Sequence, residues 1–195
     1  DSETILTNVV NVCVSDNSNV SIVDGVHEEN IVNNGPLIVF ANHYSALDIF
    51  AIQVLYKNHI SFMAKKELFN TPVVKWFIRA YRAISVDRDG NDIAAIKSAM
   101  KVLKENNILG IFPEGTRVRD GIRHDAKSGL AMLAHKLKVP MQPIKISYKR
   151  KFNLFNCIEI TVGNPIYPNE LGIVTPCGEE YEKATNKLMD IVYSM

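Results

Sequence analysis

A histidine and an aspartate stand five residues apart after a short apolar segment. The stretch reads Val39-Phe-Ala-Asn-His-Tyr-Ser-Ala-Leu-Asp48, which predicts a strand, a polar turn and a helix beginning at Ser45. Imidazoles titrate near neutral pH, so His43 can take a proton from a hydroxyl while Asp48 accepts the other ring N–H. The spacing predicts a base and its orienting carboxylate. Alternatively, Ser45-x-x-Asp48 resembles a capping box, with His43 in a surface loop.

A second stretch, Ile108-Leu-Gly-Ile-Phe-Pro-Glu-Gly-Thr-Arg117, also runs from an apolar strand into a turn. Gly115 permits close backbone approach, Thr116 offers a hydroxyl, and Arg117 offers a bidentate donor. Such groups are typical of phosphate-binding turns. No Gly-Lys-Ser/Thr follows, so the turn is not a Walker P-loop. A Pro-Glu-Gly turn with a solvated arginine is the alternative interpretation.

Three further cations stand at the ends of predicted strands. Lys65 and Lys66 follow one of them and Arg88 another, so all three could add charge around the same anion. The formal net charge of +1 hides a basic middle, since residues 61–151 carry 19 basic and 8 acidic side chains. Such a block favours phosphate, anionic lipid or nucleic acid as a partner, or else consists of solvated helix exteriors.

Several other chemistries lack support in the sequence. The three cysteines show no CxxC spacing, which favours a reducing, cytoplasmic setting over a disulfide framework or a zinc site. The other histidines lack metal-ligand spacing, so we expect no metal. GxGxxG, GxSxG and HExxH are absent. No recognised RNA- or DNA-binding signature accompanies the basic block, so we expect no nucleic acid partner.

The segments that must position these residues alternate in type. Short apolar runs predict strands at 20–26, 37–41, 60–64, 83–86, 108–112, 141–148 and 158–162. Helical periodicity predicts helices near 93–103, 130–137 and 181–192. The alternation predicts one α/β domain over residues 1–195, a sandwich with a mostly parallel or mixed central sheet flanked by helices. Ligands of such sheets usually bind beyond the carboxyl ends of strands.

Four ordered blocks together resemble the glycerolipid acyltransferase family, especially the 1-acylglycerol-3-phosphate (lysophosphatidic acid) acyltransferases. They are Asn42-His43-x4-Asp48, residues 65–88, Phe112-Pro-Glu-Gly-Thr-Arg117 and Val139-Pro-Met-Gln-Pro143. The similarity spans about residues 20–165. One block alone would be weak, but four in this order favour the base over the capping box for His43.

The resemblance implies transfer of a fatty acyl group from acyl-CoA or acyl-carrier protein to the free hydroxyl of 1-acylglycerol 3-phosphate, giving phosphatidic acid in phospholipid biosynthesis. By that analogy His43 is the general base and Asp48 its partner. The side chains expected around the acceptor phosphate are Glu114, Gly115, Thr116, Arg117, Arg88, Lys65 and Lys66. No bound cofactor or metal is implied.

Two alternatives to this interpretation stay open. The same chemistry could act on glycerol 3-phosphate or another lysolipid, or the chain could be a non-catalytic module that binds anionic lipid. A lysophospholipid acceptor implies a place at the cytoplasmic side of a membrane, held peripherally or anchored by a segment missing upstream of Asp1. Aromatic and basic side chains mix within residues 69–82, which fits either a membrane interface or a helix facing the core.

Overall fold

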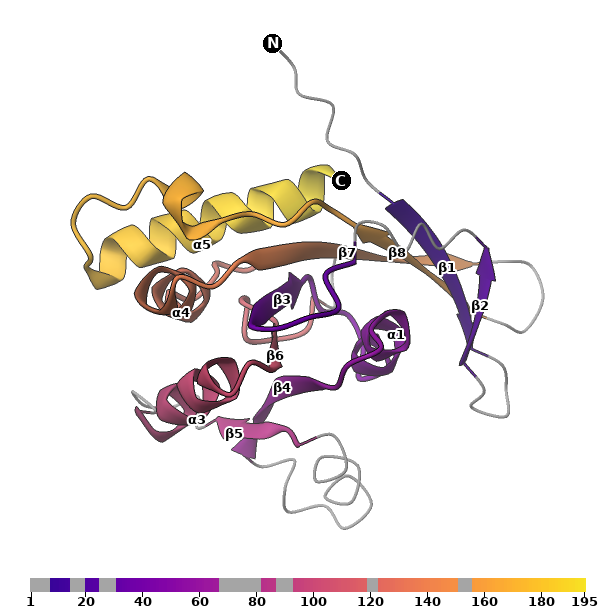
Figure 1. Ribbon diagram of the computed structural model, residues 1–195. Coiled ribbons are helices and arrows are strands. Elements are labelled where there is room, and N and C mark those ends of the chain that lie inside the picture. Colours follow the sequence, from indigo (N-terminus) through magenta and orange to yellow (C-terminus); the bar gives the residue numbers. More distant parts are fainter. Residues whose placement is uncertain are drawn as a thin grey trace.

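The computed structural model describes residues 8–14, 20–24, 31–66, 82–86, 93–118, 123–150 and 156–195. Its elements are β1 (Asn8–Val14), β2 (Val20–Asp24), β3 (Leu37–Ala41), α1 (Asp48–Leu55), β4 (Ile60–Lys65), β5 (Ile84–Val86), α3 (Ile93–Lys104), β6 (Ile108–Ile111), α4 (Gly129–Leu137), β7 (Met141–Arg150), β8 (Asn156–Val162), the 3-10 turn η3 (Pro168–Leu171) and α5 (Gly178–Ser194). Figure 1 shows their arrangement.

The strands form one mixed eight-stranded sheet in the order β2-β1-β8-β7-β3-β6-β4-β5. Strands β7, β3, β6, β4 and β5 pair in parallel, whereas β8, β1 and β2 continue the sheet with antiparallel pairs. All five residues of β3 are buried, as expected of a strand covered on both faces. The predicted α/β sandwich with a mixed central sheet and flanking helices is confirmed.

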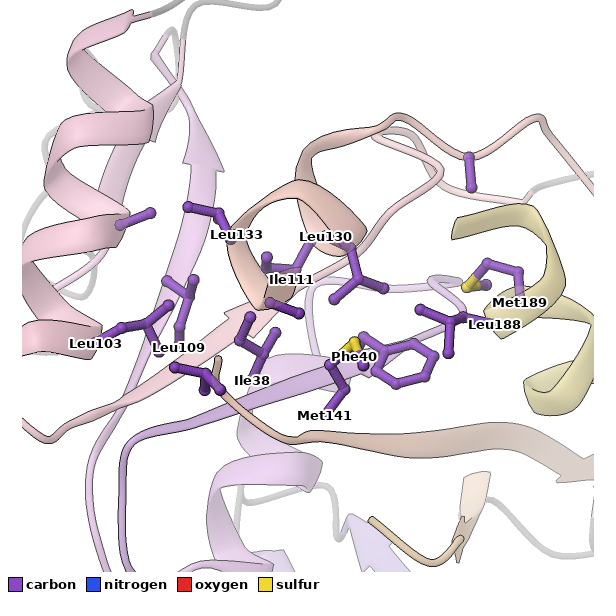
Figure 2. Close-up of a cluster of buried hydrophobic side chains, with 14 of the residues drawn as sticks. Ile38, Phe40, Leu103, Leu109, Ile111, Leu130, Leu133, Met141, Leu188 and Met189 are labelled. Carbon is purple, nitrogen blue, oxygen red and sulfur yellow. The ribbon is translucent and has the colours of Figure 1, made fainter. Parts of the chain in front are cut away.

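Helices cover both faces of the sheet, and β3 contributes alternate side chains to each (Figure 1). Leu37 and Val39 pack on the side of α1, around which the sheet curves. Ile38 and Phe40 pack on the other side against helices α3, α4 and α5, in the cluster shown in Figure 2. Because β3 is fixed by two cores, the turn that leaves its carboxyl end starts from a rigid support.

The sequence predicts most of these elements. Helices at 93–103, 130–137 and 181–192 are confirmed, and each predicted strand is present with small changes at its ends. Strand β1 was not predicted. Ile93, the first residue of α3, is 66% exposed, and the buried stripe of the helix begins at Ala95. Among the helices that the structure describes, none has the length and apolar character needed to cross a bilayer.

Candidate active site

The two motif turns meet at the carboxyl edge of the parallel strands. His43 follows β3, and the Pro-Glu-Gly-Thr-Arg turn follows β6, which pairs with β3 from Leu37↔Ile108 to Phe40↔Ile111. The backbone N–H of Val118, just after that turn, donates to the carbonyl oxygen of His43 at 2.7 Å. The parallel pairing thus places the candidate base beside the candidate phosphate-binding turn.

His43 and Asp48 form a buried hydrogen-bonded pair. His43 Nδ1 lies 2.9 Å from Asp48 Oδ2, and the two residues are 9% and 0% exposed. A carboxylate accepts and does not donate, so in the neutral imidazole Nδ1 carries the proton and Nε2 presents a lone pair. His43 is therefore not the surface-loop residue of the capping-box interpretation, and the pair has the geometry of a base with its orienting carboxylate.

Asp48 also organises the turn that precedes helix α1. Its Oδ2 accepts the backbone N–H groups of Tyr44 at 2.7 Å and Ser45 at 2.8 Å. The Asp48 N–H donates to the Ser45 carbonyl at 3.2 Å and closes a turn over residues 45–48. Helix α1 begins at Asp48, and the prediction that it begins at Ser45 is wrong. The Ser45 hydroxyl accepts the Leu47 N–H at 3.3 Å and makes no helix cap, so only half of a capping box is present.

Asn42 ties this turn to the neighbouring strand β7. Its side-chain amide donates to the carbonyl oxygen of Ile146 at 2.9 Å, and its side-chain oxygen accepts the Ile146 N–H at 2.8 Å. These two bonds extend the parallel β3–β7 pairing beyond its last register pair, Ala41↔Ile144. Through its side chain, Asn42 therefore stays attached to β7 and fixes the backbone directly before His43.

Two phenylalanines support the ring of His43. Phe112 stacks on the imidazole with 4.0 Å between ring centroids and 20° between ring planes. Phe62 of β4 lies against Phe112 at 5.7 Å and 15°. With Asp48 at its Nδ1 edge and Phe112 on one face, His43 has a fixed orientation.

Gly110 of β6 makes room for this aromatic stack. A Cβ there would lie 2.3 and 2.4 Å from two ring carbons of Phe62. We expect Gly110→Ala to lower the free energy of unfolding by about 1–3 kcal/mol through overpacking, measured by urea denaturation. Gly129→Ala is the matched control, because a Cβ at Gly129 would meet nothing within 4 Å. Equal unfolding free energies for Gly110→Ala and the wild type would contradict this packing.

Glu114 of the second motif faces the interior. It is 4% exposed, and its Oε1 accepts the Tyr193 hydroxyl of α5 at 2.8 Å and the His124 N–H at 3.3 Å. Its Oε2 is buried and has no hydrogen-bond partner within the described residues. Burial and the Glu114 hydrogen bond raise the pKa of Tyr193 above its ordinary value, so the hydroxyl stays a donor. The carboxylate thus anchors the turn to α5.

The rest of the second motif forms a tight, accessible turn. Gly115 has a positive φ of 67°, which favours glycine, and its N–H donates to the Phe112 carbonyl at 3.0 Å. Thr116 is exposed and Arg117 is half-buried. A Cβ on Gly115 would lie 3.3 Å from Cε of Lys127, so this lysine side chain runs beside the turn. Lys127 is not among the site residues expected from the sequence motifs.

Of the three other predicted cations, the structure describes Lys65 and Lys66 but not Arg88. Lys65 is the last residue of β4 and Lys66 follows it, so both lie at the same edge as His43, with β6 between β4 and β3. Arg88 falls outside the described residues. In the described ranges, no cluster of three or more His, Cys, Asp or Glu side chains is arranged to hold a metal ion.

Helix α5, which carries none of the sequence motifs, contacts the segment that follows the second motif turn. Arg123 forms an ion pair with Asp190, donates to the Asn186 carbonyl at 2.8 Å, and lies over the Tyr193 ring at 5.4 Å. The side-chain oxygen of Asn186 accepts the Ala126 N–H at 3.1 Å. These contacts join segments some 60 residues apart, and no motif in the sequence marks them.

A known protein family matches the part of the chain that carries both motif turns. Residues 23–147 match the family model described as Acyltransferase. The chain belongs to the acyltransferase family. The match contains β3, the His43–Asp48 pair and the Gly115 turn, and it ends before α5.

Individual acyltransferases resemble the chain over much of its length. A 1-acyl-sn-glycerol-3-phosphate acyltransferase of Bacillus subtilis is 32% identical over 118 residues, covering 60% of this chain and 58% of that relative. A protein of the same description from Saccharomyces cerevisiae is 30% identical over 177 residues, covering 85% of this chain and 58% of that relative. The chain thus spans less than two thirds of these relatives.

A solved acyltransferase structure shares the fold. The crystal structure of PlsC, the 1-acyl-sn-glycerophosphate (LPA) acyltransferase from Thermotoga maritima, superposes with a TM-score of 0.66 at 29% sequence identity. The similarity covers 86% of this chain and 67% of the PlsC chain.

Proposed function

We propose that this chain transfers a fatty acyl group from acyl-CoA or acyl-carrier protein to the free hydroxyl of 1-acylglycerol 3-phosphate, giving phosphatidic acid. The observation that carries the proposal is the buried His43–Asp48 pair, bonded at 2.9 Å beside the Gly115 turn. Lipid binding alone needs neither a base nor its orienting carboxylate. The descriptions of the relatives support the choice of acceptor.

In the first step, His43 removes a proton. The acceptor hydroxyl lies at Nε2 and gives up its proton as its oxygen attacks the thioester carbonyl carbon. The resulting imidazolium is stabilised by Asp48, whose Oδ2 accepts the hydrogen bond from Nδ1–H with 2.9 Å between Nδ1 and Oδ2. A positioned base of this kind contributes a rate factor of about 10²–10⁴.

In the second step, the carbon–sulfur bond breaks. The departing thiolate sulfur takes the proton from His43, so the products are the new ester and a free thiol, and the imidazole returns to its neutral form. Within the described residues, the His43 side chain hydrogen-bonds Asp48 and no serine or cysteine. The proposed transfer is direct, with no acyl-enzyme.

The acceptor phosphate binds at the turn after β6. Thr116 and Arg117 are accessible there and supply a hydroxyl and a guanidinium, while Gly115 lets the backbone approach the anion. Lys65 and Lys66 add positive charge from the end of β4, and we include Arg88 in the same role. Glu114 acts by anchoring the turn to Tyr193 and not by touching the phosphate.

Such an acceptor is a membrane lipid. We propose that the chain works at the cytoplasmic side of a membrane, peripherally or anchored, with its phosphate-binding turn turned toward the lipid headgroups. We expect no nucleic acid partner.

A test of the acceptor uses Arg117. We expect Arg117→Gln to raise the KM for 1-acylglycerol 3-phosphate by about tenfold or more, because charge-assisted hydrogen bonds contribute about 1.5–3 kcal/mol. Thiol release from acyl-CoA measures the rate. Lys136→Gln is the matched control, since it removes one exposed positive charge near the end of α4, at the opposite edge of the sheet. An unchanged KM in Arg117→Gln would contradict the phosphate role.

The same assay, run with a panel of donors and acceptors, separates the open alternatives. We expect thiol release with 1-acylglycerol 3-phosphate to exceed that with glycerol 3-phosphate and with a lysolipid that lacks a phosphate monoester. A preference for glycerol 3-phosphate or that lysolipid would keep the chemistry and change the acceptor. Salt-sensitive liposome binding without transfer from acyl-CoA or acyl-carrier protein would instead indicate a lipid-binding module.

A further inference from the structure

The second carboxylate oxygen of Asp48 has a partner far away in the sequence. Oδ2 is occupied by His43 Nδ1 and the two backbone N–H groups of the turn. Oδ1 accepts a hydrogen bond from the hydroxyl of Tyr148, 100 residues further along the chain. Tyr148 lies on β7, one residue past the family match that ends at 147.

Tyr148 reaches Asp48 from a rigid base. Strand β7 pairs with β3 up to Ile144, and Asn42 bonds both backbone groups of Ile146. Two residues further on, the Tyr148 ring lies edge-on to Tyr44, with 5.9 Å between centroids and 83° between planes. The hydroxyl and the ring of Tyr148 thus contact the same turn that carries His43.

We propose that Tyr148 is a positioning residue for the His43–Asp48 pair, in which its hydroxyl fixes the rotation of the Asp48 carboxylate so that Oδ2 stays aligned with His43 Nδ1. The catalytic part of this proposal rests on the function proposed above. Rotation about the last bond of an aspartate is soft and roughly two-fold, so bonds to a single oxygen restrain it less than bonds to both. Tyr148 supplies the bond to the second oxygen.

The protonation of Tyr148 fits this role. Burial and the hydrogen bond to Asp48 raise the pKa of its phenol above the ordinary value, so the group remains a donor at neutral pH. The groups that face it are Asp48, the Ser45 hydroxyl and the Tyr44 ring. A protonated phenol is uncharged. It can therefore hold the Asp48 carboxylate without a positive charge that would compete with the His43 imidazolium for that carboxylate.

The kinetic test compares two phenylalanine variants. Tyr148→Phe keeps the ring contact with Tyr44 and removes only the hydroxyl. We expect kcat to fall about tenfold, which corresponds to about 1.4 kcal/mol, while KM for donor and acceptor stays within about twofold. Tyr181→Phe is the matched control, since its buried hydroxyl bonds His135 at 3.0 Å and not the pair. It should leave kcat unchanged. A fall in kcat of less than twofold for Tyr148→Phe would overturn the proposal.

A double-mutant cycle tests whether Tyr148 acts through Asp48. In an Asp48→Ala background no side-chain group is left for the hydroxyl to hold, so we expect Tyr148→Phe to change kcat by less than about twofold there. The same tenfold loss in both backgrounds would show that the hydroxyl acts elsewhere and would overturn the proposal.

A spectroscopic measurement tests the effect of Tyr148 on the His43–Asp48 hydrogen bond without any substrate. The Nδ1–H of His43 in its hydrogen bond with Asp48 is observed in ¹H–¹⁵N spectra and assigned with His43→Ala. We expect this resonance to shift or broaden in Tyr148→Phe and to be unchanged in Tyr181→Phe. An unchanged resonance in Tyr148→Phe would overturn the positioning role even if the protein acylates a different acceptor. Conversely, a changed resonance together with no turnover of 1-acylglycerol 3-phosphate would contradict the proposed function alone.

Discussion

Replacing His43 with alanine is expected to lower the rate of acyl transfer by about 10²–10⁴. The variant removes the nitrogen that takes the acceptor proton, and within the described residues the Asp48 carboxylate has no second imidazole to orient. The remaining positioning of donor and acceptor still gives some rate, so the ratio of the wild-type rate to the His43→Ala rate measures what the base contributes. Initial rates of thiol release at saturating donor and acceptor provide the number.

The fold of His43→Ala is expected to survive. His43 stacks on Phe112 at the edge of the sheet and is not part of either large core cluster. Circular dichroism and thermal unfolding check this, and His43→Gln is a second variant that retains more of the side-chain volume. His135→Ala serves as the control, because His135 bonds Tyr181 on a different part of the chain. Near wild-type rates in both His43 variants would refute the role of the base.

Asp48→Asn is expected to lower kcat by about 10²–10³. Two unit charges 4 Å apart interact by about 4 kcal/mol at an effective dielectric constant of about 20, which is close to three decades in rate. The asparagine removes this charge and so withdraws its stabilisation of the imidazolium. Asp48 is 0% exposed, so bulk water does not replace the lost charge.

Asparagine is the informative substitution at this position because it can keep the turn intact. Its carbonyl oxygen in the place of Oδ2 accepts from His43 Nδ1 and from the N–H groups of Tyr44 and Ser45. Its NH₂ group then faces the Tyr148 hydroxyl, which can accept as well as donate. Thermal unfolding should therefore change little, whereas Asp48→Ala should lower the unfolding temperature by leaving buried donors unpaired. Wild-type kcat in Asp48→Asn would show that its charge is dispensable.

Features set by neighbours in the sequence were predictable. The His43–Asp48 pair spans one turn, and an apolar strand before it with a helix after it already places both side chains at a strand end. The run of residues 37–41 is buried on both faces, so its apolar character gave the strand with correct ends. Gly115 was identified as the place for close backbone approach, and it has a positive φ.

Features that depend on distant pairing were not predictable. Tyr148 meets Asp48 and Tyr193 meets Glu114 across 100 and 79 residues, and only the sheet order and the docking of α5 bring them together. Glu114 was grouped with the phosphate ligands on its motif alone, whereas its carboxylate is buried against α5. The helix start at Ser45 was wrong because residues 45–48 form a turn, closed by the Asp48 N–H donating to the Ser45 carbonyl at 3.2 Å, and α1 begins only at Asp48. Local pattern carries no information about such contacts.

Strand β1 shows a different limit. Its sequence, NVVNVCV, mixes asparagines with valines, and it pairs antiparallel with β2 and β8 near the edge of the sheet. A strand of this kind lacks the continuous apolar run that marks the buried parallel strands. Strand β1 belongs to the sheet because it pairs with β2 on one side and β8 on the other, and its composition alone does not predict a strand.

The most direct test of the central claim is product analysis by mass spectrometry. Purified wild-type protein and His43→Ala are each incubated with acyl-CoA and 1-acylglycerol 3-phosphate. We expect the wild type to form phosphatidic acid and free thiol in equal amounts, and His43→Ala to form about 10²–10⁴ times less of both. Equal product formation by the two proteins, or thiol release by the wild type without phosphatidic acid, would contradict acyl transfer by the His43–Asp48 pair.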